Sequence, residues 1–124
     1  MKKKASILVL MIIVLATSLP SAISADKSHR IHSPRGGVIS LVITDGALKN
    51  IRIYDLKFSN SGDFFSLAAA PLPAADSIKM ISINFHEGST LVQSEYVDIG
   101  PRKTVQEVYC PESFDRLVID YSGY

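Results

Sequence analysis

The sequence has a single cysteine, Cys110. One cysteine excludes any disulfide within the chain, so the fold has to be stable through packing and backbone pairing alone. The neighbouring Pro111 and Glu112 supply no positive charge that would activate a thiolate. We therefore predict that Cys110 is an unpaired, inert thiol rather than a nucleophile, with an intermolecular disulfide as the alternative.

Long apolar runs are absent after residue 20, and the one before it is short. Residues 5–19 are almost all apolar, lysines precede them at 2–4, and small residues follow up to Ala25. This order is typical of a secretory signal peptide. The run of 15 residues is shorter than the roughly 20 that span a bilayer. We predict a signal helix in 1–25, cleaved after Ala25 or alternatively after Ser24. The protein would then be exported through the general secretory pathway to the periplasm or the cell exterior, with no membrane span.

An excess of charge of one sign is also absent. The sequence has 13 Lys plus Arg and 12 Asp plus Glu. Three of the lysines belong to the predicted signal, so its removal leaves 10 against 12, a net charge of −2. Such a near-neutral mixture provides no basic patch for nucleic acids or for anionic lipid surfaces. We therefore expect no nucleic-acid partner.

No motif for a cofactor or a metal is present either. The glycines at 36–37 lack the lysine and the spacing of a phosphate-binding loop. His29 and His32 lie on either side of Arg30. Histidines at i and i+3 converge on a metal only in a helix. This polar segment has no apolar face that would hold a helix against a core. We predict no cofactor and no metal site, and we interpret these residues as a basic tail.

The residues after the predicted signal correspond to one domain. They number 99, which is 124 minus 25, and this is within the usual size of a single domain. Residues 26–37 are polar and contain a Ser-Pro pair and two glycines, as flexible chain ends often do. We predict a flexible lead-in over 26–37 and one folded domain over 38–124.

The stretch 38–58 carries the clearest structural signal in the sequence. Apolar residues alternate on both sides of Asp45-Gly46, a dipeptide that favours a two-residue hairpin turn. We predict two strands joined there, the first of them central in a sheet because both of its faces are apolar. The apolar pattern changes face at Tyr54-Asp55, which predicts a β-bulge.

Five further strands are predicted downstream. They cover 64–69, 78–85, 90–99, 102–109 and 114–121. Turns are indicated at 60–63 and at Gly88, and the alternating prolines of 71–73 indicate an extended crossover. The charged strand 102–109 is expected at a sheet edge, and 114–121 is expected to be half-buried and to tie the C-terminus into a sheet.

These elements, about seven short strands separated by turns, predict an all-β fold. We expect an antiparallel β-sandwich of jelly-roll or immunoglobulin-like type. The Cys, Trp and Cys spacing of true immunoglobulin domains is missing, because the sequence has no tryptophan. A small α+β domain with a helix over 61–70 is the alternative.

Several residues invite a catalytic interpretation, but none has a partner at a useful spacing. His86-Glu87, in a predicted turn, would need other groups to position it as a base. Asp98, Asp115 and Asp120 would have to flank a cleft to hydrolyse a glycoside. We predict no catalytic residues, and a small secreted hydrolase that uses these Asp and His residues is the alternative.

Four tyrosines fall in the second half of the sequence, at Tyr96, Tyr109, Tyr121 and Tyr124. Any that share an outward face would form a binding surface, because aromatic rings are enriched at interfaces, although strand propensity also explains them. We predict a small, exported, non-enzymatic domain that binds an unidentified protein or cell-envelope component through a sheet face or edge. An oligomer linked through Cys110 is a further alternative.

Overall fold

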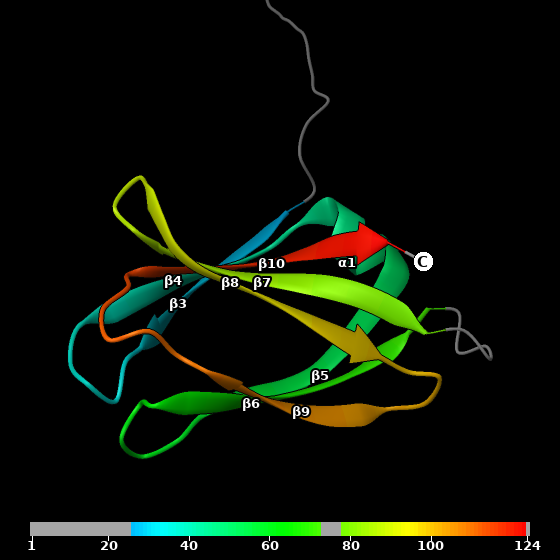
Figure 1. The fold of residues 1–124 in the computed structure, drawn as a ribbon, viewed down its shortest axis with the longest axis horizontal. Coiled ribbons are helices and arrows are strands. Elements are labelled where there is room, and N and C mark those ends of the chain that lie inside the picture. Colours follow the sequence, from blue (N-terminus) through cyan, green and yellow to red (C-terminus); the bar gives the residue numbers. More distant parts are fainter. Residues whose placement is uncertain (1–25, 73–77, 124) are drawn as a thin grey trace, which may run out of the picture.

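The computed structural model describes residues 26–72 and 78–123 (Figure 1). Strands make up 66% of it and helix 6%, so the predicted all-β class is confirmed. The predicted signal over 1–25 with its cleavage site at Ala25, part of the proline-containing connection, 73–77, and Tyr124 lie outside the described residues. No described helix is long and apolar enough to cross a membrane.

The described strands form two sheets, which lie as two layers in Figure 1. In spatial order, the first sheet contains β3 (Lys27–His32), β4 (Val38–Ile43), β10 (Arg116–Gly123), β7 (Lys79–Glu87) and β8 (Thr90–Ile99). The second contains β5 (Ile51–Phe58), β6 (Phe64–Pro71) and β9 (Thr104–Tyr109). All neighbouring strands are antiparallel except β4 and β10, which are parallel. The prediction of a purely antiparallel fold is therefore wrong at this one pair, because the last strand inserts between β4 and β7.

The core lies between the sheets and follows the alternation of the strands. The first sheet contributes Ile39, Leu41 and Ile43 from β4, Leu117 and Ile119 from β10, and Ile81, Ile83 and Phe85 from β7; the second contributes Phe65, Leu67, Ala69 and Val108. These residues occupy alternate positions, as the period of a strand requires. The other face of β4 is open, since Val38 is 41% exposed. Ser40 and Val42 on that face are half-buried. β4 lies between β3 and β10, so the prediction that it is central in a sheet is confirmed.

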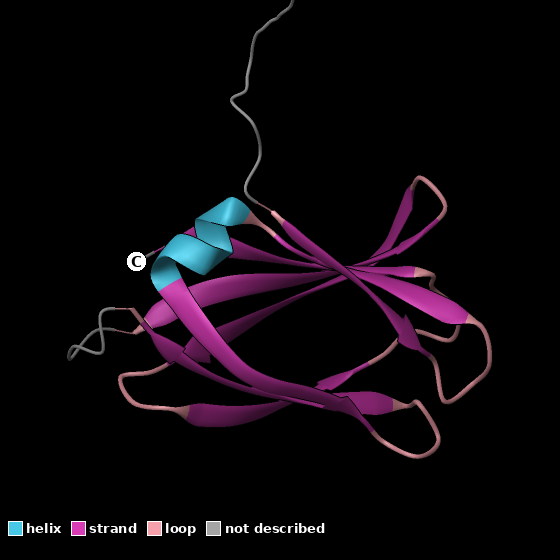
Figure 2. Cartoon of the chain, turned by 180° about the vertical axis from the view of Figure 1, so that it is seen from behind, coloured by secondary structure: helices cyan, strands magenta, loops and turns pink. Residues whose placement is uncertain are grey.

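The segment after β4 does not form the predicted hairpin. Thr44 caps a helix, α1 (Asp45–Asn50), by accepting a hydrogen bond from the backbone N–H of Ala47 (3.2 Å). Within the helix, Lys49 pairs with Asp45 one turn earlier (2.9 Å). Threonine followed by an acidic residue favours a helix start, and here it prevails over the Asp-Gly turn. As Figure 2 shows, α1 leads into β5, so the strands on its two sides belong to different sheets.

The predicted flexible lead-in is also wrong, because half of it forms β3. This strand pairs antiparallel with β4 along its whole length. Backbone hydrogen bonds between Ser33 and the glycines Gly36 and Gly37 (2.9 and 3.0 Å) close the turn between the two strands. Those glycines have φ angles of +102° and +81°, which other residues rarely adopt. Almost every side chain of β3 is exposed, so backbone pairing rather than an apolar pattern makes it a strand.

The remaining elements largely match the predictions made from the sequence. The predicted bulge occurs in β5 between Ile53 and Asp55. β5 and β6 form a hairpin over the turn at 59–63, and β7 and β8 form another around Gly88. β9 lies at the edge of the second sheet, as its charges predict. The alternative helix over 61–70 is wrong, because most of that segment is β6.

Candidate functional site

Cys110 directly follows β9 and is partly buried. Its backbone N–H donates a hydrogen bond to the carbonyl of Asp63 (2.8 Å). Burial raises the pKa of the Cys110 thiol to about 11; the charge of Arg35 acts in the opposite direction, and that of Asp63 adds to the increase. The thiol is therefore protonated at neutral pH, which makes it a weak nucleophile.

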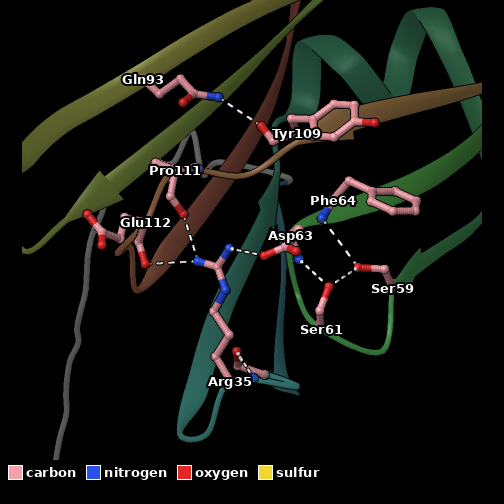
Figure 3. Close-up of polar contacts among 10 residues, drawn as sticks. Arg35, Ser59, Ser61, Asp63, Phe64, Gln93, Tyr109, Pro111 and Glu112 are labelled. Atoms are coloured by element: carbon pink, nitrogen blue, oxygen red, sulfur yellow. Dashed lines mark hydrogen bonds and ion pairs between the residues drawn. The ribbon is translucent and has the colours of Figure 1, made fainter.

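Arg35 ties three loops together beside this thiol (Figure 3). Its guanidinium donates to the backbone carbonyls of Pro111 (2.7 Å) and Glu112 (2.9 Å) and forms an ion pair with Asp63 (3.3 Å). The close approach needs Gly62, where a Cβ would lie 2.9 Å from Arg35 Cγ. The hydrogen bonds of this side chain all go to the protein's own loops. The cluster therefore ties these loops to one another.

The three aspartates considered as paired carboxylates lie apart. Asp115 precedes β10 and accepts hydrogen bonds from the N–H of Gly88, 3.2 Å from each carboxylate oxygen. Asp120 accepts one from the hydroxyl of Thr44 (2.6 Å). Asp98 is exposed on β8, and the whole of β7 separates it from β10. The structure therefore does not bring the three carboxylates together.

The histidines are also dispersed. His29 and His32 lie on β3 at an odd spacing, which in a strand places their side chains on opposite faces. His86 lies on β7, and the next residue, Glu87, accepts a hydrogen bond from the hydroxyl of Ser113 (2.7 Å). Across the described ranges, no group of three or more His, Cys, Asp and Glu side chains is arranged to hold a metal ion.

Of the four tyrosines in the second half of the sequence, the three that the structure describes do not share a face. Tyr96 pairs with Ser82 on the outer face of the first sheet. Tyr109 lies on the outer face of the second sheet, where its ring is 5.5 Å from that of Phe64. Tyr121 pairs with the buried Ile81 and is itself half-buried. The tyrosine surface considered from the sequence is therefore not formed by these three residues.

A cleft of about 650 Å³ opens between the two sheets along β3 and β5. Its apolar lining comprises Leu41 and Ile43 from β4, Leu48 from α1, and Ile51, Ile53 and Leu56 from β5. Alternation in β4 and β5 directs these side chains inward, and α1 adds Leu48 where the chain passes between the sheets. The result is an apolar space of the size that binds small ligands in other proteins, about 300–1,000 Å³.

The sheets are open on this side and joined on the other. At the opposite edge, Gln93 of β8 donates a hydrogen bond to the carbonyl of Tyr109 (2.8 Å). Close by, Gln106 of β9 donates to the carbonyl of Asp98 (3.2 Å). Within the described residues, no hydrogen bond joins β3 to β5. The absence of such bridges leaves the apolar space open at its rim.

The rim of the cleft is polar and mostly basic. Lys27 and His29 of β3 face it from the first sheet, because they pair with the inward-facing Ile43 and Leu41. Arg52 and Asp55 of β5 border it on the second sheet, but Arg52 alternates with the inward-facing Ile51 and Ile53, so its side chain lies on the outer face of β5. Arg52 lies over the ring of Tyr54, 5.2 Å from its centre. Lys27 thus presents a positive charge to the mouth of the cleft, with the imidazole of His29 beside it on the same face of β3. This arrangement favours an anionic group at the mouth of an apolar pocket.

Sequence reasoning did not identify this cleft. It assigned 26–37 to a tail and the residues of α1 to a turn, so the walls of the cleft were missed. The one available signal was the change of face at Tyr54-Asp55, because a bulge bends an edge strand and often adjoins a functional site. Comparison of the chain with protein-family models, curated proteins and solved structures finds no match.

Proposed function

We propose that this protein is a small, exported, non-enzymatic domain that binds an amphiphile of the cell envelope. The ligand has an apolar chain, held in the cleft between β3, β4 and β5, and an anionic head group at the rim. The observation that carries the proposal is the cleft of about 650 Å³, which combines an apolar lining with a mostly basic rim. A fatty acid is the simplest ligand of this class.

The lining supports an apolar chain as the buried part of the ligand. Leu48, Ile53 and Leu56 are only half-buried in the unliganded protein, so a chain in the cleft would cover apolar surface that water now reaches. Each methylene group that moves from water into such a space contributes about 0.8 kcal/mol. A long acyl chain therefore gains most of its affinity from the cleft and not from its head group.

Features of the two edge strands argue against a peptide strand as the ligand. Lys27 and His29 alternate on the side of β3 that faces the other sheet, and inward-pointing charges of this kind discourage strand addition. β5 is interrupted by its bulge at Tyr54, which breaks the regular row of backbone donors and acceptors. Of the partners considered from the sequence, an envelope component is favoured over a protein bound at a sheet edge.

We also propose that the protein is exported after cleavage at Ala25 and that its two sheets form a β-sandwich. Every described strand begins after Ala25, so cleavage at that residue would leave both sheets complete. The two layers and their shared core support a β-sandwich, with jelly-roll or immunoglobulin-like connectivity as the sequence-based prediction. The hydrolase alternative gains no support from Asp98, Asp115 and Asp120, which lie apart.

A displacement titration with an environment-sensitive fluorescent fatty acid tests the proposal. We expect saturable binding that an unlabelled fatty acid reverses. Lys27→Glu should weaken fatty-acid binding about two- to fivefold, because it replaces an attraction at the rim with a repulsion, and should leave an alcohol of the same chain length unaffected. Lys57→Glu makes the same charge change on β5 outside the cleft and serves as the matched control.

Two results would separate the parts of this proposal. If neither the acid nor the alcohol binds, the cleft is not a lipid site. If both bind and Lys27→Glu affects them equally, the apolar chain is correctly placed and the anionic head group is not.

A further inference from the structure

Four polar residues form a row across the outer face of the first sheet. The strand register places Arg30 of β3 opposite Ser40 of β4, Ser40 opposite Arg116 of β10, and Arg116 opposite His86 of β7. Residues in such a row project on the same face. Neighbouring strands are about 4.8 Å apart, so the two arginines stand on either side of Ser40. The sequence separates these residues widely, and only the parallel insertion of β10 brings them together.

A hollow of about 300 Å³ follows this row. It is lined by Arg30, Val38, Ser40, Gly88, Asp115 and Arg116. The backbone of Asp115 is fixed beneath it, because its carbonyl accepts a hydrogen bond from the N–H of Ser40 and its N–H donates to the carbonyl of His86 (both 2.9 Å). The hollow therefore has a rigid base formed from two sheet strands and the loop before β10.

Polar atoms in the row lack partners. Arg116 Nε and His86 Nδ1 are buried and make no hydrogen bond within the protein. Neither Arg30 nor Arg116 forms an ion pair with any described residue. Asp115 lines the same hollow, but its carboxylate already accepts the N–H of Gly88. Buried polar groups without partners are uncommon and costly in folded proteins, and an anion in the hollow would supply the acceptor that Arg116 Nε lacks.

We propose that this hollow binds a tetrahedral oxyanion, either free phosphate or the phosphoryl group of an ester. Guanidinium groups bind such anions through paired, charge-assisted hydrogen bonds. Arg30 and Arg116 supply these bonds from the two sides, and the hydroxyl of Ser40 supplies a donor between them. Two guanidinium groups against the one carboxylate of Asp115 leave an excess of one positive charge.

This site is separate from the lipid cleft. Successive residues of a strand point to opposite faces, so Arg30 faces the hollow whereas His29 faces the space between the sheets. The body of the first sheet thus lies between the two sites. The oxyanion is therefore not the head group of the ligand proposed for the cleft, and the two proposals stand or fall independently.

Titration of the purified protein with inorganic phosphate, followed by amide NMR shifts at constant ionic strength, tests this inference. We expect saturable shifts at Ser40 and Arg116, and weaker binding of acetate. Arg30→Gln should reduce phosphate affinity about tenfold, because a charge-assisted contact is lost. Arg30 is exposed, so this variant should still fold; Arg116→Gln, at a less exposed position, should weaken binding at least as much.

Arg102→Gln is the matched control, because this exposed residue lies outside the hollow and the variant has the same net charge. A parallel titration with glycerol phosphate distinguishes the two sources of the anion, since the tighter ligand identifies free phosphate or a phosphate ester. Equal affinity for acetate and phosphate would overturn the assignment to a tetrahedral oxyanion. Absence of saturable shifts at Ser40, or an equal loss in Arg102→Gln and Arg30→Gln, would overturn the site itself.

Discussion

Burial controls the chemistry of the Cys110 thiol, whose pKa rises to about 11 from 9.0. We predict slow alkylation by iodoacetamide at neutral pH and a rate that increases as the pH approaches 11, because only the thiolate reacts. The same protein unfolded in urea should react as an ordinary thiol and serves as the control. Equal rates for the folded and unfolded protein at pH 8 would contradict a protected thiol.

The raised pKa of Cys110 also predicts how stability depends on pH. The unfolded chain loses this proton near pH 9 and the folded protein loses it near pH 11, so the folded state holds more protons between these values. The stabilising contribution of the neutral thiol is therefore complete below about pH 9 and is lost as the pH rises towards 11. Urea unfolding of Cys110→Ser should lack this part of the decline, whereas titration of lysines and tyrosines affects both proteins. Identical profiles for the two proteins would contradict the assignment.

Arg35 is the residue whose loss should most weaken the loops at one end of the protein. Arg35→Met keeps the apolar stem but removes the hydrogen bonds to Pro111 and Glu112 and the ion pair with Asp63. We expect the free energy of unfolding to fall by about 1–3 kcal/mol, as for other hydrogen bonds that involve a charged group. Lys49→Ala removes an ion pair whose lysine is exposed to solvent and should leave the urea midpoint almost unchanged. A similar midpoint for both variants would show that Arg35 does not stabilise the loops.

At the scale of elements, β10 is the strand on which the first sheet depends. It pairs parallel with β4 and antiparallel with β7, and Ile119 is fully buried between them. Ile119→Ala should lower the free energy of unfolding by about 2–5 kcal/mol, because it leaves a cavity in the core. Val118→Ala, on the outer face of the same strand, is the control and should cost much less. Equal losses in chemical denaturation would mean that the outer face of β10 is as tightly packed as the core.

The strands that the sequence predicts correctly are those with an apolar face. Leu117 and Ile119 alternate with the outward-facing Arg116, Val118 and Asp120, and the change of pattern at Tyr54 marks a true bulge. β3 was missed because its only apolar residue is Ile31, and pairing with β4 supplies what its side chains do not. α1 was missed because Asp45-Gly46 fits a hairpin turn as well as a helix start. The residues around Asp45-Gly46 could not decide between a turn and a helix, because the outcome depends on whether β5 pairs within the first sheet or the second.

Both candidate sites depend on the arrangement of strands in the whole molecule, so neither could be found in the sequence. The cleft needs the sheets to be open along β3 and β5, and it brings Lys27 beside residues of β5 that are more than 20 positions away in the sequence, such as Ile51 and Ile53. The oxyanion hollow needs Arg30 and Arg116 on either side of β4. Both sites arise from strand order, which neither alternation nor turn signals determine.

The most direct test of the central proposal is a crystal structure of the protein with a fatty acid brominated at the end of its chain. The anomalous signal of bromine locates the chain without reference to affinity. We predict a peak inside the cleft, between Leu41 on one sheet and Leu56 on the other, with the carboxylate near Lys27. A peak confined to the exposed outer face of the second sheet, near Val105 and Tyr109, or no ordered bromine at saturating ligand, would contradict the proposal.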